Sequence, residues 1–347
     1  MKPRSVILLT PLVVASLAAC GSDNLAALTD ATELRCPVPG DLPFRLASHG
    51  FQSQNTALVA SRPRDKAEAS DTLGVPGGAS ANTYLADDAA PVTALSFVGV
   101  KARSEAANGL TARPLAGEHV SLWRHDDATA AWSMLGRAET ASDGSYAIPA
   151  SAMPANGPPV YAILEADGSC AEHHVALLPP GSKVVITDID GTLTTSDSEL
   201  LMELADATYV PQQMAAADAM AQAWAAKGYP IIYLTARPHI LQVETRTWLR
   251  DRGFPAGPVI TAATLGVEPA GYKTVWGQRM VADFGWVPVA AYGNADTDIT
   301  AYAAAGIPKD ATFIIGSLAG TSGTVAIDHN DFTAHIASFI AAQPDNR

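Results

Sequence analysis

The sequence predicts an α/β fold, in which a doubly wound, mostly parallel Rossmann-like sheet follows a small immunoglobulin-like β-sandwich. From residue 183 onward, short apolar runs alternate with stretches of helical periodicity, which is typical of a parallel sheet built from βα units. Between residues 91 and 178, strand-like runs recur at intervals of about ten residues with turn residues between them, which is typical of a sandwich. The length of 347 residues suits two such domains.

The N-terminus, MKPRSVILLTPLVVASLAAC, has the layout of an export signal. Lys2 and Arg4 precede an apolar stretch, and small residues then lead to Cys20. The sequence LAAC at 17–20 resembles the lipobox of bacterial lipoproteins, so we expect removal of a signal peptide over residues 1–19 and lipidation of Cys20. The alternative is an ordinary secretory signal in which Cys20 is incidental.

The expected location follows from this signal. Gly21 and Ser22 follow the cysteine without an acidic residue, which resembles the outer-membrane pattern of proteobacterial lipoproteins. We expect an exported lipoprotein in the outer membrane, facing the periplasm, with a secreted or soluble periplasmic protein as the alternative. Export also suits a disulfide between the remaining cysteines, Cys36 and Cys170, and two unrelated buried thiols are the alternative.

The charge of the chain excludes some partners. Without the signal peptide, 20 Lys and Arg residues oppose 35 Asp and Glu residues, which gives a formal charge of −15. The chain lacks basic clusters, so it is a poor candidate for binding nucleic acid or for electrostatic adsorption to anionic lipid. Work at a membrane would therefore depend on the N-terminal acyl anchor.

The region before the α/β pattern divides into two parts. Residues 20–90 are rich in Ala, Ser, Gly, Asp and Pro, and their weak periodicity predicts a lipid-anchored flexible linker. Residues 91–178 hold the strands of the predicted sandwich, whose protein partner the sequence does not identify. The adjacent His173 and His174 point to opposite faces of a strand, so we expect surface histidines rather than a metal site.

Polar side chains gather at the strand ends of the α/β region. The sequence VVITDIDGT places Asp188 and Asp190 directly after an apolar strand, and residues two apart on an extended chain share one face. Like charges in a half-buried site disfavour ionisation of both groups, so we expect a divalent cation beside them. Ligand oxygens without nitrogen or sulfur favour Mg²⁺. The sequence GNADTD follows a later strand and offers further ligands, Asn294, Asp296 and Asp298.

The other candidate residues suit phosphate chemistry. Thr235 ends the strand IIYLT and can donate its hydroxyl and backbone N–H to a phosphate oxygen. Lys273 can neutralise negative charge that builds up in a transition state. Metal-assisted phosphoryl transfer needs a carboxylate nucleophile, a second carboxylate, a hydroxyl, a lysine and an acidic pair, and the chain supplies them in this order. The sequence contains neither GxGxxG nor a P-loop lysine motif.

These motifs resemble those of the haloacid dehalogenase superfamily of phosphohydrolases. The chain is more similar still to the catalytic domain of lipins, the Mg²⁺-dependent phosphatidate phosphatases, a domain also present in phosphatidylinositol transfer proteins of the retinal-degeneration type. Five stretches carry this resemblance in order: DIDGTLTTSD, YLTARP, FPAGPVITA, GYKTVWGQ and AYGNADTDITAY. The resemblance covers about residues 181–320 and implies a haloacid dehalogenase-like phosphatase domain over residues 181–343.

The resemblance also implies a role for each matched residue. Asp188 would attack phosphorus to form an aspartyl-phosphate, and Asp190 would protonate the leaving alkoxide and then activate water. Arg237 would either contact the phosphate or form a salt bridge within its loop. The implied phosphate-binding residues are Gly191, Thr192, Thr235, Arg237 and Lys273. The implied metal ligands are Asp188, the main-chain carbonyl of Asp190, Asp298 and nearby Asn294, with Asp296 as the alternative to Asp298.

The spacing of the motifs predicts an open site without a large cap. Asp190 and Thr235 are separated by 44 residues, and Thr235 and Lys273 by 37, which leaves room for a helix or two in each interval. An open site suits a bulky or membrane-embedded phosphomonoester. The first hypothesis is therefore a Mg²⁺-dependent phosphatidate phosphatase that yields diacylglycerol and phosphate. The alternatives are a broad-specificity periplasmic phosphomonoesterase and a non-catalytic phosphatidate-binding module.

Overall fold

The computed structural model describes residues 50–56, 66–67, 70–83, 100–103, 112–148, 156–166, 168–205, 209–262 and 267–347. The predicted signal peptide, the lipidation site Cys20 and most of the predicted linker lie outside these residues. Cys170 is disulfide-bonded. Its predicted partner, Cys36, lies outside the described residues, so the pairing itself stays a prediction. Within the described ranges, no helix combines the length and the apolar character needed to span a membrane.

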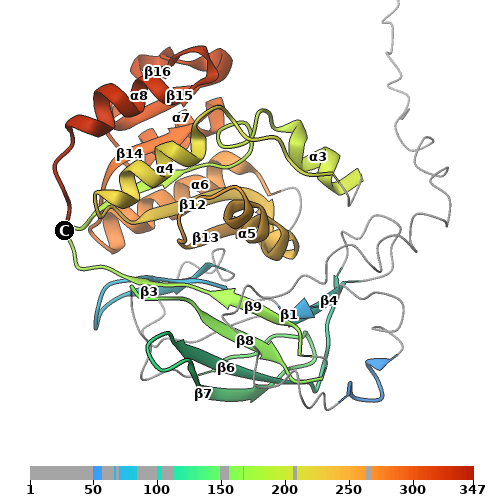
Figure 1. Ribbon diagram of the computed structural model, residues 1–347. Coiled ribbons are helices and arrows are strands. Elements are labelled where there is room, and N and C mark those ends of the chain that lie inside the picture. The colour runs from blue at the N-terminus through green and yellow to red at the C-terminus, as the bar shows by residue number, and fades with distance from the viewer. Residues whose placement is uncertain are drawn as a thin grey trace, which may run out of the picture. The chain divides into compact units, whose positions relative to one another are not determined.

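A parallel sheet of six strands forms the centre of the α/β region, in the order β13-β12-β11-β14-β15-β16 (Figure 1). Its strands are β11 (Lys183–Thr187), β12 (Ile231–Pro238), β13 (Val259–Ala262), β14 (Val287–Gly293), β15 (Thr312–Ile315) and β16 (Val325–Ile327). The chain adds β12 and β13 on one side of β11 and then crosses to add the later strands on the other side. Sheets of this kind bind ligands at such a switch point, beyond the carboxyl ends of the strands. The predicted parallel α/β sheet is confirmed.

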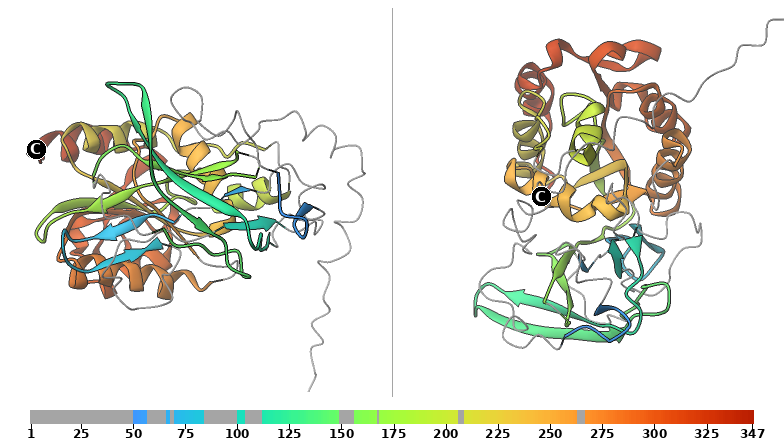
Figure 2. Two further views of the ribbon diagram at one scale, coloured as in Figure 1. Left: turned by 90° about the horizontal axis from the view of Figure 1, so that it is seen from below. Right: turned by 90° about the vertical axis from the view of Figure 1, so that its right-hand side faces the viewer.

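Helices cover both faces of this sheet, as the right-hand view of Figure 2 shows. The α-helices are α3 (Ser198–Ala205), α4 (Ala217–Ala226), α5 (Gln242–Asp251), α6 (Pro269–Gln278), α7 (Asp296–Ala304) and α8 (Thr333–His335). Alternate side chains of β11 enter different cores: Val185 packs in the same core as Trp224 of α4, whereas Ile186 packs in the core of Trp276 of α6. This period of two is what a strand buried on both faces requires.

Short helical segments complete the α/β region. The 3₁₀ segments are η2 (His239–Leu241), η4 (Lys309–Ala311), η5 (Gly316–Leu318), η6 (Thr321–Gly323) and η7 (Asp328–Asn330), and the π-helical segments are η3 (Arg279–Asp283) and η8 (Ile336–Ile340). Between Asp190 and Thr235, the described residues contain two helices, α3 and α4. Two helices in this interval agree with the one or two that the motif spacing predicted.

The N-terminal β region consists of several small sheets. A four-stranded antiparallel sheet has the order β7-β6-β8-β9 and is built from β6 (His119–Asp126), β7 (Ala131–Glu139), β8 (Val160–Leu164) and β9 (Cys170–His173). A second sheet joins β10 (Val175–Leu177) to β2 (Thr72–Gly74) and β3 (Ser80–Asn82). A third joins β1 (Lys66–Ala67), β4 (Val100–Arg103) and β5 (Ala112–Arg113). The strand-rich region is confirmed, whereas the immunoglobulin-like sandwich is not.

The prediction of a flexible linker over residues 20–90 is wrong for residues 70–83. Strand β2 pairs in parallel with β10, and the sequence VPGGA forms the turn between β2 and β3 rather than a linker. Leu73 of β2 is fully buried and packs in the same core as Trp276 of the α/β region. The surface prediction for His173 and His174 is also wrong, because both side chains are buried where β9 and β10 meet β2.

A half-buried ion pair joins two parts of the four-stranded sheet. Glu165 follows β8 and is almost fully buried, and Arg137 of β7 donates from Nε and Nη2 to its two carboxylate oxygens over 2.8 and 2.7 Å. These hydrogen bonds hold the pKa of Glu165 below its usual value. A carboxyl whose folded pKa is depressed stabilises the protein above its unfolded pKa, and this stabilisation is lost as the pH falls through the folded pKa.

Arg137→Met is therefore expected to lower the free energy of unfolding by about 1–2 kcal/mol at pH 7. The expected loss is modest for a charged pair because 47% of the Arg137 side chain is exposed. Urea denaturation at pH 7 and in acid measures the effect. The difference from wild type should shrink as the pH falls below about 4, and a difference that stays constant in acid would contradict this account.

Candidate active site

The candidate site lies where β11, β12 and β14 end. Asp188 comes directly after β11, and its backbone N–H donates to the carbonyl of Tyr292 in β14 over 3.0 Å. Thr235 lies in the last half of β12 and is fully buried. Because the three strands are parallel neighbours, their carboxyl ends meet at one edge of the sheet. The predicted nucleophile and the predicted phosphate-binding threonine therefore lie at the switch point of the fold.

Lys273 links two buried carboxylates. Its Nζ lies 2.8 Å from Oδ1 of Asp188 and 2.6 Å from Oδ1 of Asp298, and all three residues are at least 95% buried. The second oxygen of Asp298 accepts from the backbone N–H groups of Asn294 and Ala295 over 3.0 and 3.1 Å. These contacts fix Asp298 in the first turn of α7, so that its other oxygen, Oδ1, accepts from Lys273 of α6.

The charges of this group do not balance. Burial raises the pKa of Asp188 to about 8 despite the opposing effect of Lys273, and the neighbouring carboxylates of Asp298 and Asp190 raise it further. Burial works against the charge on Lys273, but the carboxylates of Asp188 and Asp298 outweigh it and raise the pKa of Lys273. Two carboxylates share one ammonium group, so an additional positive charge would stabilise the ionised site.

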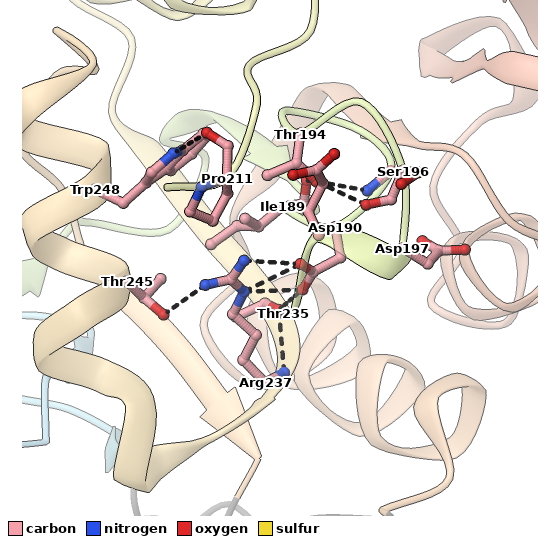
Figure 3. A network of polar contacts seen from close by, with 12 residues as sticks. Ile189, Asp190, Thr194, Ser196, Asp197, Pro211, Thr235, Arg237, Thr245 and Trp248 are labelled. Carbon is pink, nitrogen blue, oxygen red and sulfur yellow. Dashed lines mark hydrogen bonds and ion pairs between the residues drawn. The ribbon is translucent and has the colours of Figure 1, made fainter. Parts of the chain in front are cut away.

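Arg237 holds Asp190, as Figure 3 shows. Its guanidinium is fully buried and donates from Nη2 to Oδ1 over 2.9 Å and from Nε to Oδ2 over 3.0 Å. The hydroxyl of Thr235 donates to the same carboxylate over 3.3 Å and accepts from the backbone N–H of Arg237 over 3.1 Å. The structure shows Arg237 in a salt bridge, but with Asp190 on the loop after β11 rather than within its own loop. Contact of Arg237 with a phosphate stays a prediction. Asp190 keeps 15% of its side chain exposed, so it remains accessible.

The loop after Asp190 is shaped by a glycine. Gly191 has a φ of +71°, and a Cβ at this position would lie 2.1 Å from Nδ2 of Asn294 and 2.6 Å from Oδ1 of Asp197. Asn294 accepts from the Thr192 hydroxyl over 3.2 Å and donates to Asp197 over 3.1 Å. The predicted residues Gly191, Thr192 and Asn294 thus meet in one polar cluster beside Asp188.

Gly191→Ala is expected to lower the free energy of unfolding by about 2–3 kcal/mol, because the methyl group meets both a positive φ and a steric clash. Gly181→Ala is the matched control: Gly181 has a φ of +85° but no atom within 4 Å of its added Cβ, so it bears the backbone term alone. Thermal unfolding of both variants separates the two terms. Equal losses in the two variants would mean that the contact with Asn294 and Asp197 is unimportant.

Two residues of the site were not predicted from the sequence. Asp197 lies within the motif DIDGTLTTSD but was assigned no role, although it positions Asn294. Thr245 on α5 accepts from Nη1 of Arg237 over 3.3 Å, and only its place on the buried face of the helix could have suggested a contact. Conversely, Asp296 is exposed, and the structure brings Asp298 rather than Asp296 to Asp188 and Lys273.

The donor groups of the site fit Mg²⁺. Among the residues with described positions, no three His, Cys, Asp or Glu side chains form a group suited to a metal ion. The predicted set needs fewer side chains, because it combines Asp188 and Asp298 with the main-chain carbonyl of Asp190. These donors are all oxygens, and Mg²⁺ commonly uses one or two carboxylates together with water and substrate phosphate. The unbalanced negative charge of the Asp188 and Asp298 pair also favours a cation.

Residues 185–316 match the family model described as "PITM 1-3, LNS2 domain". The chain is 31% identical over 234 residues to Protein retinal degeneration B of Drosophila melanogaster, which covers 65% of this chain and 18% of that protein. It is 28% identical over 158 residues to Membrane-associated phosphatidylinositol transfer protein 3 of Mus musculus, which covers 46% of this chain and 15% of that protein. The predicted resemblance to phosphatidylinositol transfer proteins is confirmed. The chain spans less than a fifth of the length of these relatives.

Among solved structures, the chain aligns with the D,D-heptose 1.7-bisphosphate phosphatase from B. bronchiseptica, crystallised with magnesium and phosphate. The sequence identity is 14% and the TM-score is 0.33, over 46% of this chain and 99% of that chain. The predicted lipoprotein anchor, the exported location and the substrate stay predictions beside these similarities.

Proposed function

We propose that this protein is a phosphomonoester hydrolase that forms an aspartyl-phosphate on Asp188, and that phosphatidate is its substrate. The observation that carries the proposal is the different setting of two carboxylates on one loop. Asp188 is buried against Lys273, whereas Asp190 is oriented by Arg237 and partly exposed. Two carboxyl groups whose environments differ in this way can divide the work of nucleophile and of acid and base.

In the first step, Asp188 attacks the phosphorus atom and the bond to the leaving alkoxide breaks. Lys273 holds Oδ1 of Asp188 at 2.8 Å, while Oδ2 has only a long contact of 3.5 Å with the Thr192 hydroxyl. Oδ2 is therefore the oxygen that is free to attack. Asp190 gives a proton to the departing alkoxide, so that the alcohol leaves in neutral form.

In the second step, water hydrolyses the aspartyl-phosphate. Asp190, now deprotonated, takes a proton from the water while the water oxygen bonds to phosphorus. The bond between phosphorus and Asp188 breaks, phosphate is released, and Asp188 is a free carboxylate again. Arg237 and Thr235 keep the Asp190 side chain in place through both steps. Mg²⁺, held by Asp188, the Asp190 carbonyl and Asp298, would offset the negative charge that the substrate phosphate brings.

Two observations support a lipid substrate. The first is the resemblance to lipins, together with the match to proteins named as membrane-associated phosphatidylinositol transfer proteins. The second is a set of exposed apolar side chains that follow Asp197 in the sequence: Leu201 and Met202 of α3 and Val210 are 65%, 49% and 57% exposed. Helix α3 begins one residue after Asp197, which accepts from the amide of Asn294. Acyl chains of a bound phosphatidate would meet apolar side chains there.

Relatives named as phosphatidylinositol transfer proteins also favour a second candidate, a phospholipid-binding module that does not hydrolyse its ligand. Phosphatidate is the ligand that we propose for this module as well. The predicted acyl anchor at Cys20 would place either protein at the lipid surface, on the periplasmic side of the outer membrane. The presence of Asp188, Asp190 and Lys273 in contact distance of their partners supports hydrolysis.

The test is phosphate release by the full chain from phosphatidate in mixed micelles and from p-nitrophenyl phosphate, with and without Mg²⁺. We expect Mg²⁺-dependent release that favours phosphatidate and that Asp190→Asn reduces about 100-fold or more for the lipid. Preference for the aryl ester would instead indicate a broad phosphomonoesterase. Vesicle sedimentation completes the test, because binding to phosphatidate without any release would establish the binding module.

A further inference from the structure

Helix α5 contacts the active site and the N-terminal β region through two adjacent residues. Thr245 accepts from Nη1 of Arg237 over 3.3 Å, and Arg237 holds the carboxylate of Asp190 with its two other nitrogens (Figure 3). Arg246, the next residue, forms an ion pair with Asp71. Thr245 is fully buried, and Arg246 is 8% exposed. Helix α5 therefore connects Arg237, which holds Asp190, to Asp71. Asp71 lies outside residues 185–316, which the family model matches.

Asp71 is the point at which three elements meet. Its side chain is fully buried just before β2. Oδ1 accepts from the backbone N–H of His174 over 2.8 Å, and Oδ2 accepts from the backbone N–H of Val259 over 2.6 Å and from Arg246. One carboxylate thus ties the junction of β9 and β10 to the start of β13 and to α5.

The charges across this contact are complementary. Glu172 of β9 lies near Arg246 and Arg250 of α5. Burial alone would raise the pKa of Glu172, but the hydrogen bond from His174 and the two arginines lower it. Two acids of the β region, Asp71 and Glu172, therefore face two arginines of one helix. Of these four groups, Asp71 and Arg246 are both buried, and such a pair tolerates little displacement, because removing one partner leaves the other unpaired.

We propose that α5 is a positioning element for Asp190, and that Asp71 fixes this helix through Arg246. Thr245 is the positioning residue nearest the site, since its hydroxyl helps to set the rotation of the Arg237 guanidinium. Loss of that acceptor would remove one of the hydrogen bonds that fix the Arg237 guanidinium and would turn the carboxylate that it holds. This inference rests on the proposed function, because it assigns Asp190 the protonation of the leaving group.

The leaving group provides the test. An alkyl phosphate such as phosphatidate needs a proton on its departing oxygen, whereas p-nitrophenolate leaves without one. In the full chain, Thr245→Val is expected to lower kcat roughly tenfold more for phosphatidate in mixed micelles than for p-nitrophenyl phosphate, with KM little changed. Thr245→Ser keeps the hydroxyl and should restore the wild-type ratio of the two rates.

Asp71→Asn tests the other end of the helix. The amide keeps an acceptor for His174 but turns its NH₂ group toward the donors of Val259 and Arg246. We expect the same selective loss of kcat with phosphatidate. In the double variant Asp71→Asn/Thr245→Val, the fold-loss of kcat should be smaller than the product of the two single fold-losses, because both changes act through Arg237. Arg137→Met is the matched control: it breaks a half-buried ion pair elsewhere in the β region and should leave the ratio of rates unchanged.

Each outcome has one meaning. Equal losses for both substrates in Thr245→Val, or no loss in either, would overturn the proposal, as would failure of Thr245→Ser to restore the ratio. A changed ratio in Arg137→Met would also overturn it, because general destabilisation would then explain the effect. If Asp71→Asn does not fold, the Thr245 pair still decides the role of α5. Lack of phosphate release by the wild-type chain from either substrate would instead overturn the proposed function.

Discussion

Asp188→Asn is expected to abolish phosphate release while leaving the protein folded. The amide cannot form the aspartyl-phosphate, so kcat for phosphatidate should fall by at least about 10³-fold. The substitution keeps the size of the side chain, and its oxygen can still accept from Lys273. Phosphate release in the presence of Mg²⁺ measures the loss. Substantial activity in this variant would rule out Asp188 as the nucleophile.

The same variant should be at least as stable as wild type in a buffer that contains a chelator. Asp188 is buried beside two other carboxylates, and its pKa is raised to about 8. An acid with a raised folded pKa keeps its proton in the folded state after the unfolded chain has lost it. Wild-type stability should therefore fall relative to the variant as the pH rises from about 4 to 8. Thermal unfolding at both ends of this range provides the measurement, and a variant that is less stable than wild type at pH 8 would contradict the argument.

The sequence allowed much of this site to be predicted, because its residues lie at strand ends or in local motifs. Asp188 and Asp190 belong to one loop, and the alternation of apolar strands and helices places that loop at the edge of a parallel sheet. The choice between Asp296 and Asp298 was left open because both lie in one short stretch. The structure shows that the first turn of α7 buries Asp298 beside Lys273 and exposes Asp296. Which of the two would hold a metal ion stays a prediction.

The role of Arg237 could not be predicted because a guanidinium binds a phosphate or a carboxylate equally well. The prediction for residues 70–83 of the N-terminal β region was wrong for a different reason. Strand β2 has three residues, too few to show a period, and Asp71 beside it finds its partners 103, 175 and 188 positions away. Contacts over such separations leave no local pattern, so a Gly- and Pro-rich hairpin was interpreted as a linker.

Lys273→Met is expected to lower stability more than any other single change considered for this site. The substitution removes the ammonium group of Lys273, which contacts Asp188 and Asp298, and both carboxylates are buried. Breaking a buried pair in this way costs about 3–5 kcal/mol, and phosphate release should be lost as well. Urea denaturation in a chelating buffer measures the loss of stability. Lys227→Met is the matched control, since this partly exposed lysine contacts only backbone carbonyls, and its effect should stay within about 1 kcal/mol.

A double-mutant cycle shows whether the carboxylate is the cause. In Asp188→Asn/Lys273→Met, one of the two unpaired charges is gone, and the other, Asp298, keeps its two backbone donors. The double variant should therefore be more stable than Lys273→Met alone, and the two single effects should not add. Mg²⁺ should stabilise Lys273→Met more than wild type, because a cation that binds the folded state replaces the missing charge. Additive effects together with no response to Mg²⁺ would mean that Lys273 stabilises the fold by packing rather than by its charge.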